Sequence, residues 1–195
     1  MKNRYFILPK FKISNELYND ILSISKDNFR FYGTRRKRLY MCSVNLFVIP
    51  KLQEILDQLY DPSIVDNYEI MYTEPGAIVM PHIDSRRRVA LNIPIKGEFE
   101  KSYIGIFEKQ GKVVPNIEFF DTNDLVKEGG GYPGSKLIDK VTYTQPICLN
   151  TEEVHNVVNL SNKDRIVLGL GFDTRLSFAD IEKMHEQNKL VLCQK

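Results

Sequence analysis

The chain reads Met80-Pro81-His82-Ile83-Asp84 at one point and, far downstream, Val154-His155-Asn156 leading to Arg165-Ile166-Val167-Leu168. In an extended strand, side chains two positions apart point to the same face, so His82 and Asp84 can reach one point together. A second strand must bring His155 to that point. The two segments therefore predict a β structure in which distant strands share one site.

The rest of the chain from about Asn67 supports a β core. Short runs of β-type residues, separated by turn residues such as Pro75-Gly76 and Lys96-Gly97, occupy 68–73, 77–80, 89–95, 103–107, 117–120, 141–144 and 165–172. Many short strands with turns at this spacing indicate a sandwich or barrel. We expect a mainly β fold with flanking helices.

Helical patterns flank this core on both sides. Apolar residues repeat at helical spacing over 15–26 and 50–60, and a further helix is expected from Phe178, with Ser177 as its N-cap. A chain of 195 residues is most simply one domain. We expect helical support over 1–66, the β core over 67–175 and the C-terminal helix over 176–195.

Composition excludes several classes of protein. The hydrophobic fraction of 43% and the net charge of +2 are ordinary for a soluble protein and give no field that points to nucleic acid. No stretch is apolar for long enough to span a membrane. The three cysteines, Cys42, Cys148 and Cys193, are widely spaced and indicate free thiols in a reducing compartment. We expect a cytoplasmic protein.

The chemistry suggested by these segments is that of a metal site. Two histidines and one carboxylate on one face hold ferrous iron and leave coordination positions open. His82, Asp84 and His155 are the candidate ligands. Arg165, ten positions after His155, suits a cosubstrate that carries a carboxylate. A surface salt bridge is the alternative role for Arg165.

These residues resemble the iron(II)/2-oxoglutarate-dependent oxygenase superfamily. The resemblance covers about residues 68–173 and rests on Tyr72-Thr73-Glu74-Pro75-Gly76, His82-Ile83-Asp84, Arg88–Ile95, Asn150-Thr151, His155–Asn159 and Arg165. The last segment looks most like the aspartyl/asparaginyl or prolyl hydroxylase-like members of phage or bacterial type. The resemblance implies a double-stranded β-helix, or jelly roll.

The resemblance also implies cofactors and roles. His82, Asp84 and His155 would bind Fe(II), and Arg165 would bind the far carboxylate of 2-oxoglutarate. Dioxygen would be the second cosubstrate, with succinate and CO2 as co-products. Many members have Ser or Thr two residues after the arginine, where this chain has Val167. Either another hydroxyl assists, with Tyr68, Tyr72 and Thr151 as candidates, or the arginine works alone.

Some features leave alternatives open. Asn92 interrupts an apolar strand, so it is either a cosubstrate ligand or an ordinary polar residue. Of the arginines at 86–88, we expect Arg88 to face inward and the other two to be solvated. The glycine-rich stretch 129–134 is either a lid or a plain surface loop.

The substrate is the least determined part. Residues 96–140, together with the basic runs at 35–38 and 86–88, are expected to form the rim of the substrate cleft. A basic rim favours hydroxylation of a peptide or protein side chain, or of a polar small molecule. Nucleic acid is disfavoured, because the nucleic-acid demethylases of this superfamily carry a second arginine closely after the cosubstrate arginine. In this chain the next arginine after Arg165 is Arg175, ten residues on. The competing interpretations are a non-enzymatic, cupin-like metal-binding jelly roll, an oxygenase acting on a small metabolite, and a metal enzyme that uses no 2-oxo acid.

Overall fold

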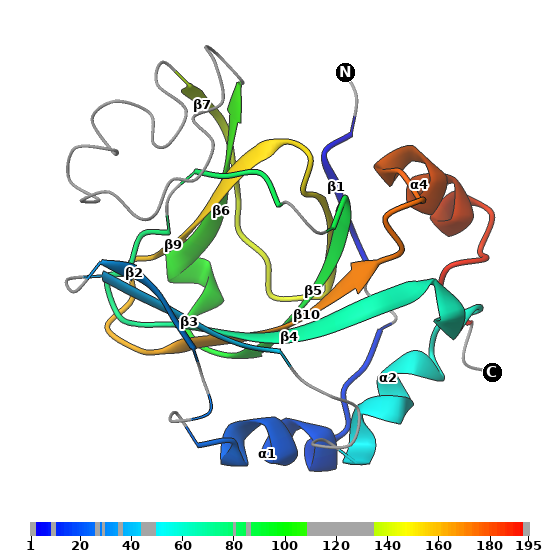
Figure 1. Ribbon diagram of the computed structural model, residues 1–195, viewed down its shortest axis with the longest axis horizontal. Helices are drawn as coiled ribbons and strands as arrows, with labels where there is room; N and C mark the ends of the chain where they lie inside the picture. Colours follow the sequence, from blue (N-terminus) through cyan, green and yellow to red (C-terminus); the bar gives the residue numbers. More distant parts are fainter. Residues whose placement is uncertain are drawn as a thin grey trace.

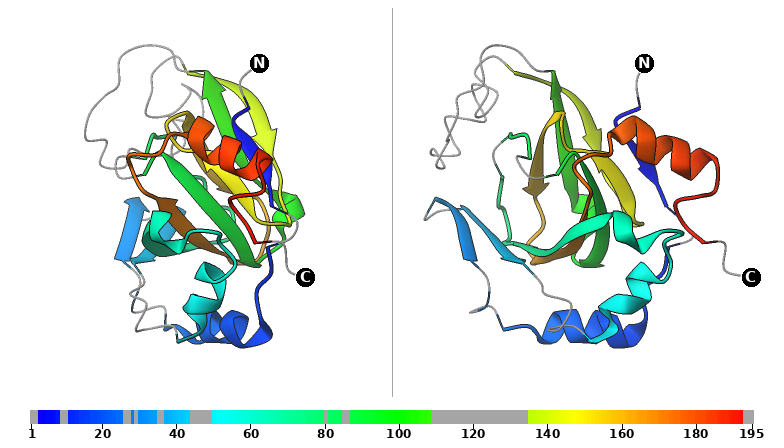
Figure 2. Two further views of the ribbon diagram at one scale, coloured as in Figure 1. Left: turned by 90° about the vertical axis from the view of Figure 1, so that its right-hand side faces the viewer. Right: turned by 45° about the vertical axis from the view of Figure 1, so that its right-hand side comes forward.

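A computed structural model describes residues 3–8, 11–25, 28, 30–34, 37–43, 50–79, 81–84, 87–108 and 135–192. Over these residues the chain forms two antiparallel β-sheets that face each other (Figures 1 and 2). The larger sheet has the strand order β1-β8-β5-β10-β4-β3-β2 and the smaller one β7-β6-β9. This is the jelly roll that the sequence predicted.

The bounds of the strands follow the chain. They are β1 (Tyr5–Ile7), β2 (Arg30–Thr34), β3 (Lys37–Ser43), β4 (Val65–Thr73), β5 (Val89–Lys96), β6 (Ser102–Glu108), β7 (Lys136–Val141), β8 (Ile147–Asn150), β9 (Val154–Asn159) and β10 (Arg165–Phe172). The helices are α1 (Asn15–Ser23), α2 (Gln53–Leu56) and α4 (Phe178–Glu186), with short 3-10 turns at Pro50–Leu52, Pro62–Ile64 and Phe99–Lys101.

Strand β10 lies at the centre of the larger sheet, between β4 and β5, and is buried along its whole length. Its two faces meet different partners because side chains alternate along a strand. Ile166, Leu168, Leu170 and Phe172 face the helices, whereas Arg165, Val167 and two glycines face the smaller sheet. One strand therefore serves both the main core and the interior between the sheets.

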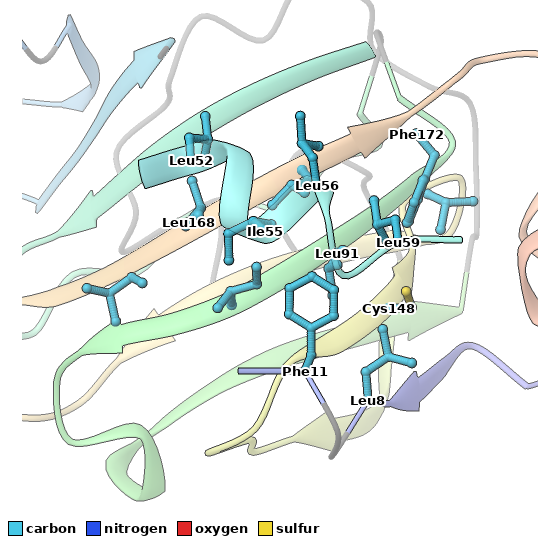
Figure 3. Packing of buried hydrophobic residues seen from close by; sticks show 14 of the residues in the cluster. Leu8, Phe11, Leu52, Ile55, Leu56, Leu59, Leu91, Cys148, Leu168 and Phe172 are labelled. Atoms are coloured by element: carbon cyan, nitrogen blue, oxygen red, sulfur yellow. The ribbon is translucent and has the colours of Figure 1, made fainter. Parts of the chain in front are cut away.

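The main core lies between the larger sheet and the helices. Figure 3 shows Ile55 and Leu56 of α2 stacked over Leu168 and Leu91 of the sheet. Each such apolar side chain, once buried, contributes about 1.5–3 kcal/mol to folding. A second cluster lies between the two sheets and includes Met71, Ile104, Ile106, Leu149 and Val167. This second cluster fills part of the space between the two sheets, and polar side chains lie at its edges.

The helical predictions are confirmed with shorter bounds. Helix α1 ends at Ser23, and the segment 50–60 forms only one 3-10 turn and the short helix α2. Helix α4 begins after Ser177, which forms a capping box with Asp180, and ends at Glu186. No helix among the described residues is long and apolar enough to cross a membrane.

The expectation that residues 1–66 are helical support was incomplete. Strand β1 pairs with β8, and β3 pairs with β4, so this region also adds three strands to the larger sheet. Strand β1 has only three residues, which is too short to show a period.

Most predicted strands are found, but two need correction. The run 77–80 is not a strand among the described residues and forms a single bridge at Ile78. The run 141–144 was misplaced, because β7 ends at Val141 and β8 begins at Ile147. Strand β7 is at the edge of its sheet and largely exposed, so its sequence lacks the apolar alternation of a core strand. The run 117–120 lies outside the described residues.

Candidate metal centre and anion site

The three predicted metal ligands meet at one point. One ligand atom each from His82, Asp84 and His155 lies within 4.8 Å of the others. His82 Nε2 is 3.3 Å from Asp84 Oδ1, and His155 Nε2 is 3.8 Å from the same oxygen. Both imidazoles therefore present Nε2 to one carboxylate oxygen, an arrangement that matches a divalent ion held by two nitrogens and one oxygen.

Backbone pairing brings these side chains together. His82 and His155 form an antiparallel bridge and exchange both backbone hydrogen bonds, at 2.8 and 2.9 Å. Further back along the same segment, Val79 N donates to Val157 O at 2.7 Å. The segment around His82 thus runs beside β9, as the shared-site prediction required.

His155 is prepared to act as a neutral ligand. Its ring is buried, and Nδ1 lies 2.9 Å from the carbonyl oxygen of Glu153. A carbonyl only accepts, so Nδ1 carries the proton and Nε2 keeps its lone pair. Burial, and then the neighbouring His82, lower the pKa of His155 to about 4. At neutral pH the imidazole is therefore uncharged, as metal binding requires.

Asp84 is held as a carboxylate by its neighbours. Burial alone would raise the pKa of Asp84, but the hydrogen bond from His82 and the charge of Arg87 outweigh burial and hold it well below its usual range. Arg87 Nε donates to Asp84 Oδ2 at 2.5 Å, and Arg87 Nη1 lies 3.1 Å from Glu69 Oε2. Asp84 therefore faces the histidines with one oxygen and Arg87 with the other.

The expectation for the arginines at 86–88 was wrong in one respect. Arg87 is the inward residue, with a side chain 11% exposed, whereas Arg88 is 40% exposed and pairs with Glu152 at 2.8 Å. Arg88 lies in a bend just before β5 rather than in the strand, so alternation counted back from β5 gave the wrong side. Arg86 lies outside the described residues.

Arg165 occupies the other end of the interior. Its side chain is 2% exposed, its Nη2 donates to the hydroxyl oxygen of Tyr143, and its guanidinium lies 5.3 Å from the centre of the Phe99 ring. Within the described part of the chain no carboxylate lies within ion-pair distance, and the buried Nε has no hydrogen-bond partner. A buried, unpaired cation is costly, so the site calls for an anion.

Further unpaired polar atoms line the same face of the larger sheet. Thr73 lies opposite Arg165, Asn92 opposite Gly169, and Asn67 opposite Gly171. The side-chain oxygens of all three are buried and have no hydrogen-bond partner among the described residues. Native interiors leave few such atoms unpaired. Their position on one face of β4, β5 and β10 indicates that a polar ligand belongs between the two sheets.

The structure places the predicted residues as follows. His82, Asp84 and His155 lie together. Asn92 and Arg165 both lie on the face of the larger sheet that points to the smaller sheet. Tyr72 lies opposite Ile166 and packs against the helix-side core, on the other face from Arg165. Thr151 donates its hydroxyl to the backbone oxygen of Arg87 at 2.8 Å, near the metal ligands rather than near Arg165. Tyr68 also packs against the helix-side core.

Three residues of the site escaped the sequence analysis. Thr73 stands inside the quoted motif, but only strand register reveals that it faces Arg165. Tyr143 lies between β7 and β8 and carried no signal beyond being an aromatic hydroxyl in a β-type run. Arg87 was assigned to solvent because it belongs to a run of three arginines.

Two asparagines that flank His155 have structural roles. Asn156 Oδ1 accepts from the backbone of Gly105 at 3.1 Å. Asn159 is fully buried and bonds the backbone oxygens of Thr73 and Lys163 at 3.1 and 2.9 Å. The hydrogen bonds of Asn159 close the turn that leads into Arg165. Gly97 packs closely against the start of β10, where an added Cβ would lie 3.1 Å from Arg165 Cα.

Comparison with known proteins places the fold. No protein-family model matches the sequence, and no curated protein matches it. Among solved structures, the chain is similar to a prolyl hydroxylase from Trichoplax adhaerens in complex with a hypoxia-inducible factor peptide, with 12% identity, a TM-score of 0.56, and coverage of 89% of this chain and 84% of that one.

Two further structures are similar to the same degree. HygX from Streptomyces hygroscopicus, solved with nickel and 2-oxoglutarate, has 13% identity and a TM-score of 0.54 over 89% of this chain and 84% of its own. The alpha-ketoglutarate-dependent carbocyclase SnoK of nogalamycin biosynthesis also has 13% identity and a TM-score of 0.54, over 85% and 78%. At such identities the likeness shows the jelly-roll fold shared with these oxygenases.

Proposed function

We propose that this protein is an Fe(II)- and 2-oxoglutarate-dependent dioxygenase. The observation that carries the proposal is the buried Arg165, which has no carboxylate partner among the described residues, in the same interior as the His82, Asp84 and His155 cluster. A metal site alone fits many jelly rolls, whereas a metal site together with a buried cation favours an acid that bridges the two. The similarity of the fold to oxygenases that use 2-oxoglutarate supports this choice.

The residues fit the metal by the chemistry of the donor set. Two neutral imidazole nitrogens and one carboxylate oxygen suit ferrous iron and leave other positions for an acid and for dioxygen. When bound, iron would supply the activation of dioxygen coupled to decarboxylation of 2-oxoglutarate to succinate and CO2. The protein would supply the position of the acid and the shielding of the site.

The acid would be held by residues at the opposite end of the interior. Arg165 would pair with its far carboxylate, and the hydroxyl groups of Tyr143 and Thr73 would donate to the same group. Asn92 lies opposite Gly169, next to Arg87 Nη1, and would contact the middle of the acid. We assign the assisting hydroxyl to Tyr143 and Thr73 rather than to Tyr72 or Thr151, because Tyr72 faces the helices and Thr151 is engaged by Arg87.

Burial of these groups also serves the reaction. Tyr143 is enclosed, and burial, opposed in part by the charge of Arg165, raises the pKa of its phenol. The phenol therefore stays protonated at neutral pH and can donate to a carboxylate. Phe99 and Tyr143 flank the Arg165 guanidinium with their rings and exclude water from the ion pair, which strengthens it.

Hydroxylation of a peptide or protein side chain is the substrate class that we propose, with a polar small molecule as the alternative. The prolyl hydroxylase with bound peptide supports the first, and the carbocyclase of nogalamycin biosynthesis supports the second. The basic rim expected from the sequence gives this proposal little support, because Arg87 and Arg88 are both paired with carboxylates. The rest of that rim at 35–36, 86 and 109–134 lies outside the described residues. We place the reaction in the cytoplasm, where the free thiol of Cys148 and ferrous iron are both stable.

The test is uncoupled turnover. The protein, supplied with ferrous iron, 2-oxoglutarate and air, is expected to form succinate slowly without a prime substrate. His82→Ala should abolish this formation, whereas His185→Ala, on α4 and stacked on Phe6, should leave it unchanged. Tight metal binding without any decarboxylation would favour a non-enzymatic, cupin-like protein or a metal enzyme that uses no 2-oxo acid.

The substrate class has its own test. Peptide libraries and small polar metabolites are offered separately to the iron-loaded protein, and products are examined for a mass gain of one oxygen. A peptide or protein product is expected. Stimulation of succinate release by a small metabolite alone would contradict the protein-substrate proposal.

A further inference from the structure

The two oxygens of Asp84 face different partners. Oδ1 lies 3.3 Å from His82 Nε2 and 3.8 Å from His155 Nε2, which is the side where an ion would bind. Oδ2 accepts a hydrogen bond from Arg87 Nε at 2.5 Å. The second oxygen is therefore engaged before any metal arrives.

Arg87 is itself fixed from several directions. Its Nη1 lies 3.1 Å from Glu69 Oε2, and its backbone oxygen accepts the hydroxyl of Thr151 at 2.8 Å. The backbone of Asp84 donates to Thr151 at 3.2 Å, so one threonine ties both ends of this short loop. The guanidinium rests over Gly169, where an added Cβ would lie 3.4 Å from Nη1.

We propose that Arg87 is a positioning residue that holds Asp84 so that only Oδ1 faces the metal. The proposal rests on the proposed function, because it assumes that the His82, Asp84 and His155 cluster binds a divalent ion. A carboxylate that binds through one oxygen occupies one coordination position, whereas one that binds through both occupies two. By engaging Oδ2, Arg87 would keep the remaining positions open for the acid and dioxygen.

The geometry requires arginine rather than any cation. Nε donates to Asp84, while Nη1, on the other side of the planar group, lies within ion-pair distance of Glu69 without hydrogen-bond geometry. A lysine has one ammonium group on a flexible stem and cannot hold two carboxylates in the same fixed orientation. The nearby Arg88, which is 40% exposed and pairs with Glu152, offers a matched control of equal charge.

Positioning and plain electrostatics predict opposite effects. If Arg87 acted only through its charge, its removal would strengthen the binding of a divalent cation, since a positive charge close to the ion would be lost. If Arg87 orients Asp84, its removal weakens metal binding, as loss of the partners behind metal ligands typically does by about 10- to 100-fold. The direction of the change separates the two roles.

The experiment is a titration of the metal-free protein with Co(II), followed by calorimetry and by the visible absorption of the bound ion. We expect Arg87→Ala and Arg87→Lys to weaken Co(II) binding by about 10- to 100-fold and to alter the absorption spectrum. Arg88→Ala should change neither. An affinity for Co(II) equal to or tighter than that of the unmodified protein in both Arg87 variants would overturn the proposal.

A double-mutant cycle shows whether Arg87 acts through Asp84. In an Asp84→Asn background, Arg87→Ala should cause no further loss of Co(II) affinity, because the ligand that it positions is already impaired. An equal loss in both backgrounds would contradict the proposal. Circular dichroism of each metal-free variant confirms folding, and the Arg87→Lys variant decides the question if Arg87→Ala does not fold.

The outcome also separates this inference from the proposed function. Failure of the unmodified protein to bind Co(II), or unchanged binding after His155→Ala, would contradict the metal site itself. Binding that is lost in His155→Ala but unchanged in both Arg87 variants would contradict only the role of Arg87.

Discussion

Arg165 and Tyr143 contact each other across the interior, the first at the start of β10 and the second in the segment that joins β7 to β8. The guanidinium donates to the phenol oxygen and also lies 5.5 Å from the centre of the same ring. Tyr143 therefore fixes the orientation of the cation while its own proton stays available to a ligand. This pair defines the anion end of the site.

Tyr143→Phe removes the phenol oxygen and keeps the ring. Because a hydrogen bond to a charged group contributes about 1.5–3 kcal/mol, we expect 2-oxoglutarate to bind the metal-loaded protein more weakly by about that amount. Calorimetry under anaerobic conditions measures the change. Tyr103→Phe, on β6 with Lys140 over its ring, is the control and should have no effect. Unchanged affinity in Tyr143→Phe would remove this residue from the site.

Gly105→Ala is expected to destabilise the protein without touching the candidate ligands. A Cβ at this position of β6 would lie 2.4 Å from Asn156 Oδ1, which accepts from the backbone of Gly105 itself. Asn156 would have to move and lose this bond. We expect the free energy of unfolding to fall by about 1–3 kcal/mol, as measured with urea. Gly76→Ala is not a fair comparison, because φ there is 68° and adds strain of its own.

Cys148 should be unreactive in the folded protein. It lies in the helix-side core, and burial raises the pKa of its thiol far above the usual range. A thiol reacts as its thiolate, so Cys148 should not react with iodoacetamide in the native state even at pH 9. Peptide mass spectrometry should find the label on this residue only after unfolding. Labelling at the rate of a free thiol in the native protein would show that the core is open there.

Ser177 contributes to stability as the N-cap of α4. Its hydroxyl accepts from the backbone of Asp180, whose side chain accepts in return from the backbone of Ser177. Ser177→Ala should lower the free energy of unfolding by about 1 kcal/mol, whereas Ser177→Thr, which keeps the hydroxyl that also donates to Asp180 Oδ2 at 2.6 Å, should keep most of it. Thermal unfolding of the two variants provides the comparison. No loss of stability in Ser177→Ala would indicate that the cap contributes little.

The core of the fold was predictable because its strands are strongly patterned. The run Arg165–Phe172 was predicted with the bounds that β10 has, and β5 and β6 came within a residue or two. Strands that lie at sheet edges, such as β7 and β1, were misplaced or missed. An edge strand buries few side chains, so its sequence does not need the apolar period that reveals a strand.

The candidate site likewise contains residues that the sequence could predict and residues that it could not. His82, Asp84 and His155 could be predicted to meet because few residue types bind metals and the chain has three histidines. Thr73 and Tyr143 could not be predicted, because their approach to Arg165 depends on strand register and on the path of a loop. Arg87 and Arg88 could not be told apart by charge alone. Their roles follow from which of them meets Asp84 and which meets Glu152.

The most direct test of the central claim is an anaerobic titration of the protein with ferrous iron and 2-oxoglutarate, followed by visible absorption. A weak charge-transfer band is expected only when both are present, and His155→Ala should abolish it. Arg165→Ala should weaken 2-oxoglutarate binding by about 2–5 kcal/mol, because a buried carboxylate would lose its partner. Absence of the band, or a band that forms with the same affinity in Arg165→Ala, would contradict the account.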